Sequence, residues 1–291
     1  MVTTAVLAEP EVPTARIGWL AWVRRNPTIV IGTAVLAALV AIAILAPWIA
    51  EDPLNFEPTN RLKRPSETFW FGTDQFGRDV YSRVIYGSRV SLIVGASVAV
   101  LATALGLVIG IVCGFHRGVD SVVMRVMDGI MAIPAILLAI ALITLMKASL
   151  LIVIVAITVP EIPRVVRLVR SVVLTVRGLP YIEAAIAGGT RPFALMARHI
   201  LPTTVAPLIV QATYVCASAI LTEAGLSFLG AGTPPETPSW GNVISLGRTF
   251  FQISPWIIFF PGVFLAVTVL AINLVGDGLR DTLDPRLARR M

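Results

Sequence analysis

Residues 28–50 read TIVIGTAVLAALVAIAILAPWIA, a run of 23 residues without a charged side chain. A helix needs about 20 such residues to cross the hydrocarbon core of a bilayer, which is about 30 Å thick. The apolar region of a cleavable signal peptide is only about 7–15 residues long. The run therefore predicts an uncleaved transmembrane helix.

Five more uncharged runs follow, and together with the first they predict six membrane spans. These runs are 90–115, 129–146, a run from about residue 148 to Pro160-Glu161-Ile162-Pro163, 200–222 and 249–276. The two prolines of the fourth run predict its end, because proline lacks the N–H that helical hydrogen bonding requires. An even number of spans places both termini on the same side of the membrane.

The composition of the whole chain is also that of a membrane protein. Of its 291 residues, 56% are hydrophobic and 14% are charged, and the mean hydropathy is +0.85. A soluble domain is about 45–50% apolar and about 25% charged. These values exclude a disordered protein, a secreted disulfide scaffold and a soluble enzyme. The net charge of +6 comes from basic residues that flank the apolar runs, a pattern that topology explains better than nucleic-acid binding.

The basic residues predict the orientation. If the amino terminus is inside, 15 of the 23 lysines and arginines fall in inner segments. Because cytoplasmic segments are enriched in Lys and Arg, both termini are predicted to be cytoplasmic. The chain then divides into a cytoplasmic tail (1–27), a first transmembrane helix (28–50), an extracytoplasmic segment with an amphipathic helix (51–88) and a five-helix core (89–291).

Residues for catalysis or metal binding are scarce. Cys113 and Cys216 lie in apolar runs, and His116 and His199 have no further ligand at metal-binding spacing, so no metal site is predicted. The phosphate-binding motif G-x-x-x-x-G-K-[ST] is absent, so the chain itself is predicted to bind no cofactor and to be no enzyme. The sequence shows no nucleophile–base pair, which disfavours an intramembrane hydrolase.

A short helix is predicted in the loop 171–202 between the fourth and fifth runs, within PYIEAAIAGG at 180–189. Pro180 suits the first turn of a helix, and the helix dipole favours Glu183 there. Gly189 can take the left-handed conformation that ends a helix. The alanines make this helix thin enough to enter a groove on another protein, although an ordinary surface helix explains the same pattern.

Two segments outside the predicted spans combine charged, aromatic and turn-forming residues. GTDQFGRDVYSR at 72–83 precedes the second span, and Asp79 and Arg83 have the i,i+4 spacing of a stabilising ion pair in a helix. EAGLSFLG at 223–230 follows the fifth span, and Trp240 in the next loop is predicted to anchor that loop at the membrane interface.

Three glycines of the second span, Gly106, Gly110 and Gly114, recur every four residues and therefore share one helix face. Small residues in such a stripe let another helix approach closely. A contact within the chain is favoured over a contact with a partner subunit, but the sequence leaves both open.

Other ionisable residues fall near the ends of the predicted spans. Arg125 and Asp128 are predicted to form a local ion pair at the inner start of the third span. Glu161 is expected at the inner end of the fourth span, and Glu223 at the outer end of the fifth. Charged groups at membrane depth are functional candidates by default, but both of these positions suggest contact with water.

Four separate segments of the chain, in the right order, resemble the permeases of binding-protein-dependent ABC importers. EAA at 183–185, Gly189 and ILP at 200–202 resemble the signature coupling loop of that family. The segments that narrow the resemblance to the second permease of peptide-type and nickel-type importers are 72–83, 223–230 with PSWG at 238–241, and NLVGDGLRD at 273–281 with DPR at 284–286. The resemblance covers residues from about 20 to 291.

The resemblance implies an all-α integral protein of the plasma (inner) membrane with six helices and the type I ABC importer permease fold. It also implies four kinds of partner: a homologous second permease, two cytoplasmic ATPase subunits that bind ATP and magnesium, an extracytoplasmic substrate-binding protein and the lipid bilayer. The residues implied in coupling to the ATPase are Glu183, Ala184, Ala185, Gly189, His199, Leu201 and Pro202. Those implied in an outer gate or a binding-protein contact are Asp74, Arg78, Asp79, Arg83, Glu223, Pro238 and Trp240.

The function expected from the resemblance is import of di- or oligopeptides. ATP hydrolysis by the partner subunits would drive alternating access between two rigid-body states. Nickel or another small solute remains open as the substrate. The alternative is a secondary transporter driven by an ion gradient, which would require buried carboxylates at the middle of the membrane, whereas the predicted spans are uncharged.

Overall fold

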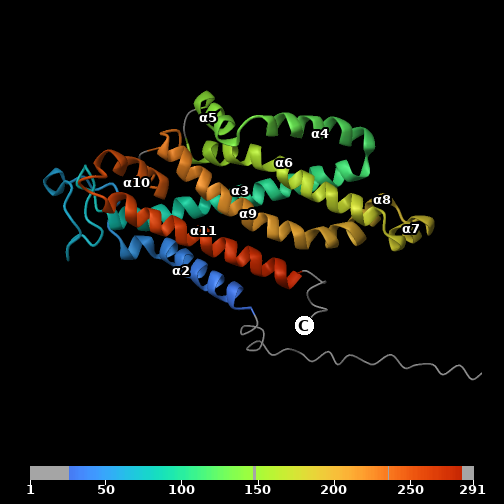
Figure 1. The fold of residues 1–291 in the computed structure, drawn as a ribbon, viewed down its shortest axis with the longest axis horizontal. Coiled ribbons are helices and arrows are strands. Elements are labelled where there is room, and N and C mark those ends of the chain that lie inside the picture. Colours follow the sequence, from blue (N-terminus) through green and yellow to red (C-terminus); the bar gives the residue numbers. More distant parts are fainter. Residues whose placement is uncertain (1–25, 147–148, 235, 284–291) are drawn as a thin grey trace, which may run out of the picture.

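The computed structural model describes residues 26–146, 149–234 and 236–283, so most of the predicted tail 1–27 and the DPR segment at 284–286 lie outside it. The described chain is a bundle of helices (Figure 1) with one isolated antiparallel bridge between Thr73 and Asp79. The α-helices are α2 (Pro27–Ile49), α3 (Val80–Phe115), α4 (Arg117–Ala132), α5 (Ala135–Leu145), α6 (Leu150–Arg177), α7 (Pro180–Ala187), α8 (Pro192–Leu195), α9 (Leu201–Phe228), α10 (Trp240–Gly247) and α11 (Trp256–Leu283).

The connecting segments gather at the two ends of the bundle. Residues 50–79 and α10 lie at the left of Figure 1, and we call this the α10 end. Helices α7 and α8 lie at the right, and we call this the α7 end. The first residues of α2 and the last residues of α11 both point towards the α7 end. The described chain therefore begins and finishes on the same side of the bundle.

Four segments are long and apolar enough to cross a membrane: α2, α3, the continuous helical run Pro192–Phe228 that contains α9, and α11. Helices α4 and α5 would make a fifth if the pair counts as one span. The third predicted run, 129–146, is not one continuous helix, because the chain bends by 90° between α4 and α5. Ile133 is extended there (φ −93°, ψ 129°), as expected of a residue that precedes a proline.

The fourth predicted span does not end at Pro160 and Pro163, because α6 continues through both prolines to Arg177. Each proline removes one N–H donor, but neighbouring helices can support a helix across such a gap. The second half of α6 carries several arginines, so α6 is not among the helices that qualify as spans by composition.

The glycine face of α3 is the contact that holds this part of α6. A Cβ atom added to Gly106, Gly110 or Gly114 would lie only 2.4–2.6 Å from a valine side chain of α6. The valines opposite, in the same order, are Val165, Val169 and Val173. The glycines therefore allow a close contact within the chain, and their matching order shows that α3 and α6 run parallel.

The amphipathic surface helix predicted before the second span is the first part of α3 and not a separate helix. Helix α3 begins at Val80 and runs unbroken to Phe115, so the expected boundary between residues 88 and 89 falls inside a helix. The first turns are core rather than surface, since Val80 and Val84 are fully buried. The carboxylate of Asp79 caps this helix by accepting hydrogen bonds from the backbone N–H groups of Tyr81 and Ser82.

Candidate functional site

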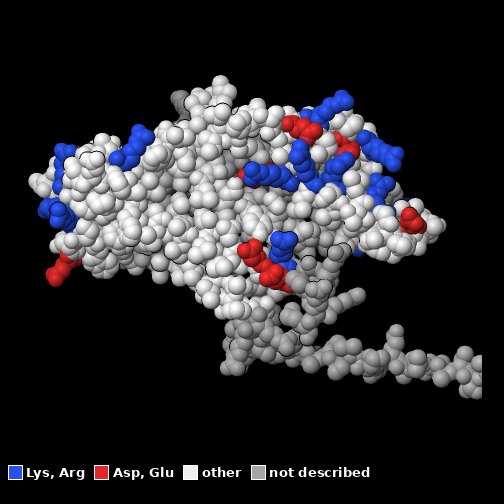
Figure 2. Space-filling view, viewed as in Figure 1, with Lys and Arg blue, Asp and Glu red and all other residues white. Residues whose placement is uncertain are grey.

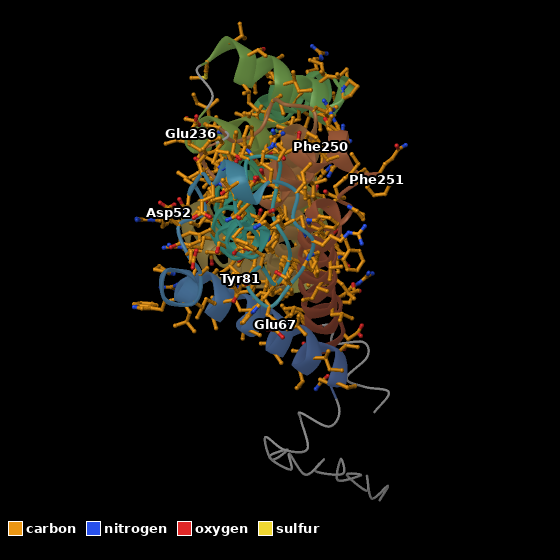
Figure 3. All side chains as sticks on the ribbon, turned by 90° about the vertical axis from the view of Figure 1, so that its left-hand side faces the viewer. Asp52, Glu67, Tyr81, Glu236, Phe250 and Phe251 are labelled. Carbon is orange, nitrogen blue, oxygen red and sulfur yellow. The ribbon has the colours of Figure 1, made fainter. Side chains whose placement is uncertain are left out.

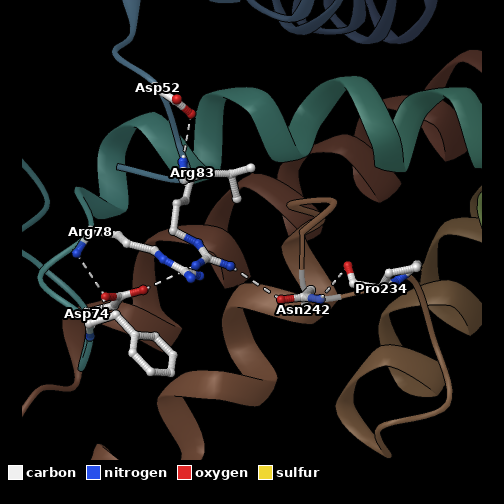
Figure 4. A network of polar contacts seen from close by, with 8 residues as sticks. Asp52, Asp74, Arg78, Arg83, Pro234 and Asn242 are labelled. Carbon is white, nitrogen blue, oxygen red and sulfur yellow. Dashed lines mark hydrogen bonds and ion pairs between the residues drawn. The ribbon is translucent and has the colours of Figure 1, made fainter. Parts of the chain in front are cut away.

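A buried polar network ties α3 to α10 at the α10 end (Figure 4). The Arg83 guanidinium is fully buried; its Nη1 donates to Oδ2 of Asp74 at 3.2 Å and its Nη2 donates to Oδ1 of Asn242 at 3.3 Å. The other oxygen of Asp74 accepts from the backbone N–H groups of Phe76 (2.8 Å) and Arg78 (3.0 Å). The predicted pair between Asp79 and Arg83 is therefore wrong: Arg83 pairs with Asp74.

The network continues from α10 to α9. The backbone N–H of Asn242 donates to Oγ of Ser239 at 3.1 Å, and the Ser239 hydroxyl donates to Oε1 of Glu223 at 2.7 Å. Ser227 donates to the same carboxylate oxygen at 2.7 Å, and the Asn242 amide donates to the carbonyl of Pro234 at 3.4 Å. Glu223 is fully buried. One connected set of hydrogen bonds thus joins α3, α9 and α10.

The seven residues predicted for an outer gate or a binding-protein contact all lie at this end. Asp74, Arg83, Glu223, Pro238 and Trp240 are buried, so their side chains are not available at the surface of this chain. Trp240 is not the predicted interfacial anchor: it is fully buried, and its Nε1 donates to the Val84 carbonyl at 3.0 Å.

Sequence reasoning missed Asn242 and Ser239, which connect the two carboxylates of this network. Ser239 had a usable signal, because a serine directly before an apolar helix is a common N-cap, and its hydroxyl does cap α10. Nothing in the sequence identifies Asn242, because its partner Arg83 lies 159 residues away.

Exposed acidic and aromatic side chains surround the buried network. Figure 3 views the α10 end, where the exposed residues Asp52 and Glu67 come from the segment 50–79 and Glu236 comes from the loop between α9 and α10. Trp70 and Phe251 are 63% and 56% exposed. These residues, rather than the buried ones, form the surface that a partner could touch at this end.

Helix α7 projects from the opposite end and is attached through one side. Ile182 is fully buried in the main hydrophobic core, while Glu183 and Ala184 on the other side are exposed. Gly188 caps the helix, and Gly189 follows with φ +78°, the left-handed conformation predicted for it. The loop therefore presents a short, firmly anchored helix with a free outer face.

The remaining residues predicted for coupling lie beside α7. Ala185 is half-buried, and the His199 ring lies 6.2 Å from the Tyr181 ring, measured between centroids. His199 belongs to a π-helical turn, Met196–Ile200, that leads directly into α9, where Leu201 and Pro202 form the first turn. The structure thus brings α7 beside the π-helical turn from which α9 continues.

Charged side chains on the face drawn in Figure 2 gather towards the α7 end. Two ion pairs there join α4 to α6: Arg167 Nη2 lies 2.5 Å from Asp128, and Arg170 contacts both carboxylate oxygens of Asp120. The predicted local pair between Arg125 and Asp128 is therefore wrong, because Asp128 pairs with an arginine of another helix. These pairs hold α4 against the basic side of α6.

Glu161 lies in the middle of α6 rather than at the end of a span. Its side chain is 6% exposed and accepts a hydrogen bond from Nη1 of Arg164 at 3.2 Å. The hydroxyl of Ser218 on α9 donates to the same oxygen at 2.9 Å. A carboxylate, a guanidinium and a hydroxyl therefore meet where α6 packs against α9.

The described residues contain no group of three or more His, Cys, Asp or Glu side chains that could hold a metal ion. Cys113 and Cys216 are free thiols. Cys113 is buried and Cys216 is half-buried, and both lie within long helices of the bundle.

Comparison with protein families and known proteins agrees with the resemblance of the motifs. Residues 106–289 match the family described as binding-protein-dependent transport system inner membrane component, and residues 19–65 match the N-terminal TM domain of oligopeptide transport permease C. The chain is 53% identical over 290 residues to the probable peptide ABC transporter permease protein y4tQ of Sinorhizobium fredii, covering 100% of this chain and 99% of that one. It is 40% identical to the dipeptide transport system permease protein DppC of Alkalihalophilus pseudofirmus, covering 91% and 88%.

A solved structure supports the same assignment at the level of the fold. A chain in an inward-facing structure of the MetNI methionine ABC transporter superposes with a TM-score of 0.56 at 21% identity, covering 69% of this chain and 96% of that chain. The described helices thus have the type I ABC importer permease fold. With a family model that matches most of the chain and a relative that matches all of it, this multi-pass membrane protein belongs to the inner membrane components of binding-protein-dependent transport systems.

Proposed function

We propose that this chain is one permease subunit of an ABC importer that brings peptides across the plasma membrane. The observation that carries this proposal is similarity over the full length to a relative named as a peptide permease. Relatives named for dipeptide and oligopeptide transport support the same substrate class. Membership of the family gives no support to the alternative of an ion-gradient-driven transporter.

The subunit crosses the membrane six times, with both termini in the cytoplasm. Five of the crossings are α2, α3, the bent pair α4–α5, α9 and α11. The remaining crossing is α6, which carries too many charged residues to qualify by composition alone. It runs parallel to α3 in close contact along the glycine face, and α3 qualifies as a span. In the order of the chain, the bent pair α4–α5 follows α3 and precedes α6, and it returns the chain to the α10 end. The α7 end then faces the cytoplasm and the α10 end faces outwards.

Helix α7 is the coupling helix, and its exposed face docks on a cytoplasmic ATPase. Ile182 attaches it to the core, so a push on α7 is transmitted to the bundle. Glu183 and Ala184 are exposed on the surface of α7, where a partner can contact them. ATP and magnesium are bound by the ATPase subunits, and the chain itself supplies no catalytic group.

The buried network at the α10 end acts in the outer gate. Its hydrogen bonds join α3, α9 and α10, so these helices would swing together when the ATPases close. A homologous second permease forms the other wall of the substrate path, and a substrate-binding protein delivers peptide at the α10 end. The transport cycle then needs a change in packing between two permeases and no covalent step in this chain.

Affinity purification of the tagged chain in mild detergent tests this function. We expect recovery of a second multi-span permease and of ATPase subunits whose hydrolysis rate rises when binding protein and peptide are added. Recovery of the chain alone, or as a homo-oligomer without an ATPase, would refute the proposal.

A charge reversal tests the docking surface in the same experiment. Glu183→Arg should lower the amount of ATPase that co-purifies, because it places a positive charge on the outer face of α7. Glu67→Arg is the matched control, since Glu67 is equally an exposed glutamate but lies at the opposite end. Unchanged ATPase recovery with Glu183→Arg would show that α7 does not dock there.

A further inference from the structure

The contact between α3 and α6 gives the depth of Arg164 in the membrane. Gly106 of α3 packs on Val165 of α6, and the two helices run parallel. Arg164 therefore lies level with Leu105. The uncharged run 90–115 of α3 has its midpoint within one helical turn of Leu105. Arg164 thus sits near the middle of the membrane, deeper than its place at the start of a basic segment indicates.

For a charged residue at this depth, the side chain of Arg164 is unusually exposed. Its side chain is 52% exposed, whereas its partner Glu161 is 6% exposed. A guanidinium has five N–H donors, and the hydrogen bonds to Glu161 use only Nη1. Because a charged side chain is costly in lipid, it normally faces a water-filled space or another protein at membrane depth. The exposed side of Arg164 therefore does not face lipid.

Polar groups continue from Arg164 towards the α7 end. Ser218, Tyr214 and Gln211 fall on one face of α9, because they are spaced four and three residues apart. A cavity of about 390 Å³ lies along the Gln211–Tyr214 part of this face. It is lined by Leu168 of α6, by Ala206, Pro207, Val210, Gln211 and Tyr214 of α9, and by Arg280 and Leu283 of α11. Leu168 is one turn from Arg164, and Ser218 contacts the partner of Arg164. A cavity whose polar lining residues are Gln211, Tyr214 and Arg280, among otherwise apolar ones, thus lies one turn from Arg164 on the side of the α7 end.

We propose that Arg164 lines the substrate path at mid-depth and binds a carboxylate group of the passing substrate. This inference rests on the proposed function, since it assigns a contact within the path of a peptide importer. A peptide carries a carboxylate at its C-terminus, and arginine can bind a carboxylate through two parallel hydrogen bonds. Glu161 and Ser218 are positioning residues: Glu161 accepts hydrogen bonds from one side of the guanidinium, and Ser218 donates to Glu161, which leaves the other side of the guanidinium free.

Water access to position 164 tests the location. In the complete importer, Cys113 and Cys216 are replaced by Ala, and Arg164→Cys is compared with Leu105→Cys, a control at the same depth that is 46% exposed in this chain. A charged, membrane-impermeant methanethiosulfonate reagent should modify Arg164→Cys at least about tenfold faster, and binding protein with saturating peptide should slow that reaction. Equal, slow modification of both variants would show that Arg164 packs against the second permease, and would overturn the proposal.

A pair of substrates tests the chemistry. In proteoliposomes, uptake of a transported peptide is compared with uptake of the same peptide as its C-terminal amide, using the same binding protein throughout. Arg164→Gln should reduce the preference for the free carboxylate by about tenfold, the loss expected for about 1.4 kcal/mol of interaction, and Arg164→Lys should keep part of it. An equal loss for both substrates would show a structural role only. The proposed function is checked separately, because it fails only if the unaltered importer transports no peptide.

Discussion

At the scale of single residues, the most constrained contact is the ion pair between Arg83 and Asp74. Both side chains are at most 1% exposed, and the pair closes the network at the α10 end. Removing one partner of a buried ion pair typically costs about 3–5 kcal/mol, because it leaves a buried charge without compensation. Arg83→Gln should therefore lower the thermal unfolding midpoint of the purified complex markedly.

The matched double variant separates this cost from a general loss of packing. Asp74→Asn combined with Arg83→Gln replaces two charges by two amides that can still hydrogen-bond to each other. We expect this variant to unfold at a higher temperature than Arg83→Gln alone, since no buried charge is left unpaired. If the double variant is destabilised by the sum of the losses from the two single substitutions, the ion pair does not stabilise the gate. The network then loses its proposed role.

The same residue shows where sequence reasoning fails. Spacing along the chain favours Asp79 as the partner of Arg83 and Arg125 as the partner of Asp128, because i,i+4 and i,i+3 neighbours meet on a helix. The structure instead uses Asp79 as a helix cap and pairs Asp128 with Arg167 on another helix. Partner choice here depends on how helices pack, and local spacing contains no information about packing.

At the scale of elements, α7 is the segment whose form follows most directly from its sequence. Pro180 and Gly189 bracket the helix as local rules predict, and Ile182 is its one fully buried residue. The longer helices were harder to predict. Pro160 and Pro163 suggest an end, yet α6 continues because the glycine face of α3 supports it, whereas Ile133-Pro134 does break the third run. A proline alone does not distinguish these outcomes, because neighbouring helices decide between them.

The end of α7 offers a test at this scale. Gly189 has φ +78° and no other atoms near its Cβ position, so a side chain there is opposed by backbone strain and not by a clash. Gly189→Val should cost roughly 1–2 kcal/mol locally and misplace the loop after α7. We expect peptide uptake to fall while the amount of protein in the membrane stays unchanged.

The neighbouring glycine provides the control. Gly188 has φ −76°, which any residue can adopt, and a Cβ there would lie 3.4 Å from the nearest atom. Gly188→Ala should therefore leave uptake close to that of the unaltered importer. Normal uptake with Gly189→Val would show that coupling does not depend on the left-handed turn at Gly189.

At the scale of the whole molecule, the arrangement of the long apolar helices follows from the sequence in outline but not in detail. The uncharged runs locate α2, α3, α9 and α11, because lipid requires long apolar helices. They do not reveal that α3 is extended by ten residues before its uncharged run or that α6 continues through Glu161 and Arg164 as one helix. Those features are tolerated because other helices of this chain and the proposed partner subunit shield them from lipid.

The two ends of the molecule should therefore be accessible from opposite sides of the membrane. Glu67 is exposed at the α10 end and Ala187 is exposed at the α7 end. In intact cells, a membrane-impermeant thiol reagent should modify Glu67→Cys, and Ala187→Cys should react only after the membrane is permeabilised. Residues on opposite sides are joined by an odd number of crossings. Because α3 lies between the two positions and crosses once, either both α6 and the bent pair α4–α5 also cross, or neither does. Modification of both cysteines from outside would leave α7 on the same side as a binding protein, where no ATPase could reach it, and the coupling role of α7 would have to be abandoned.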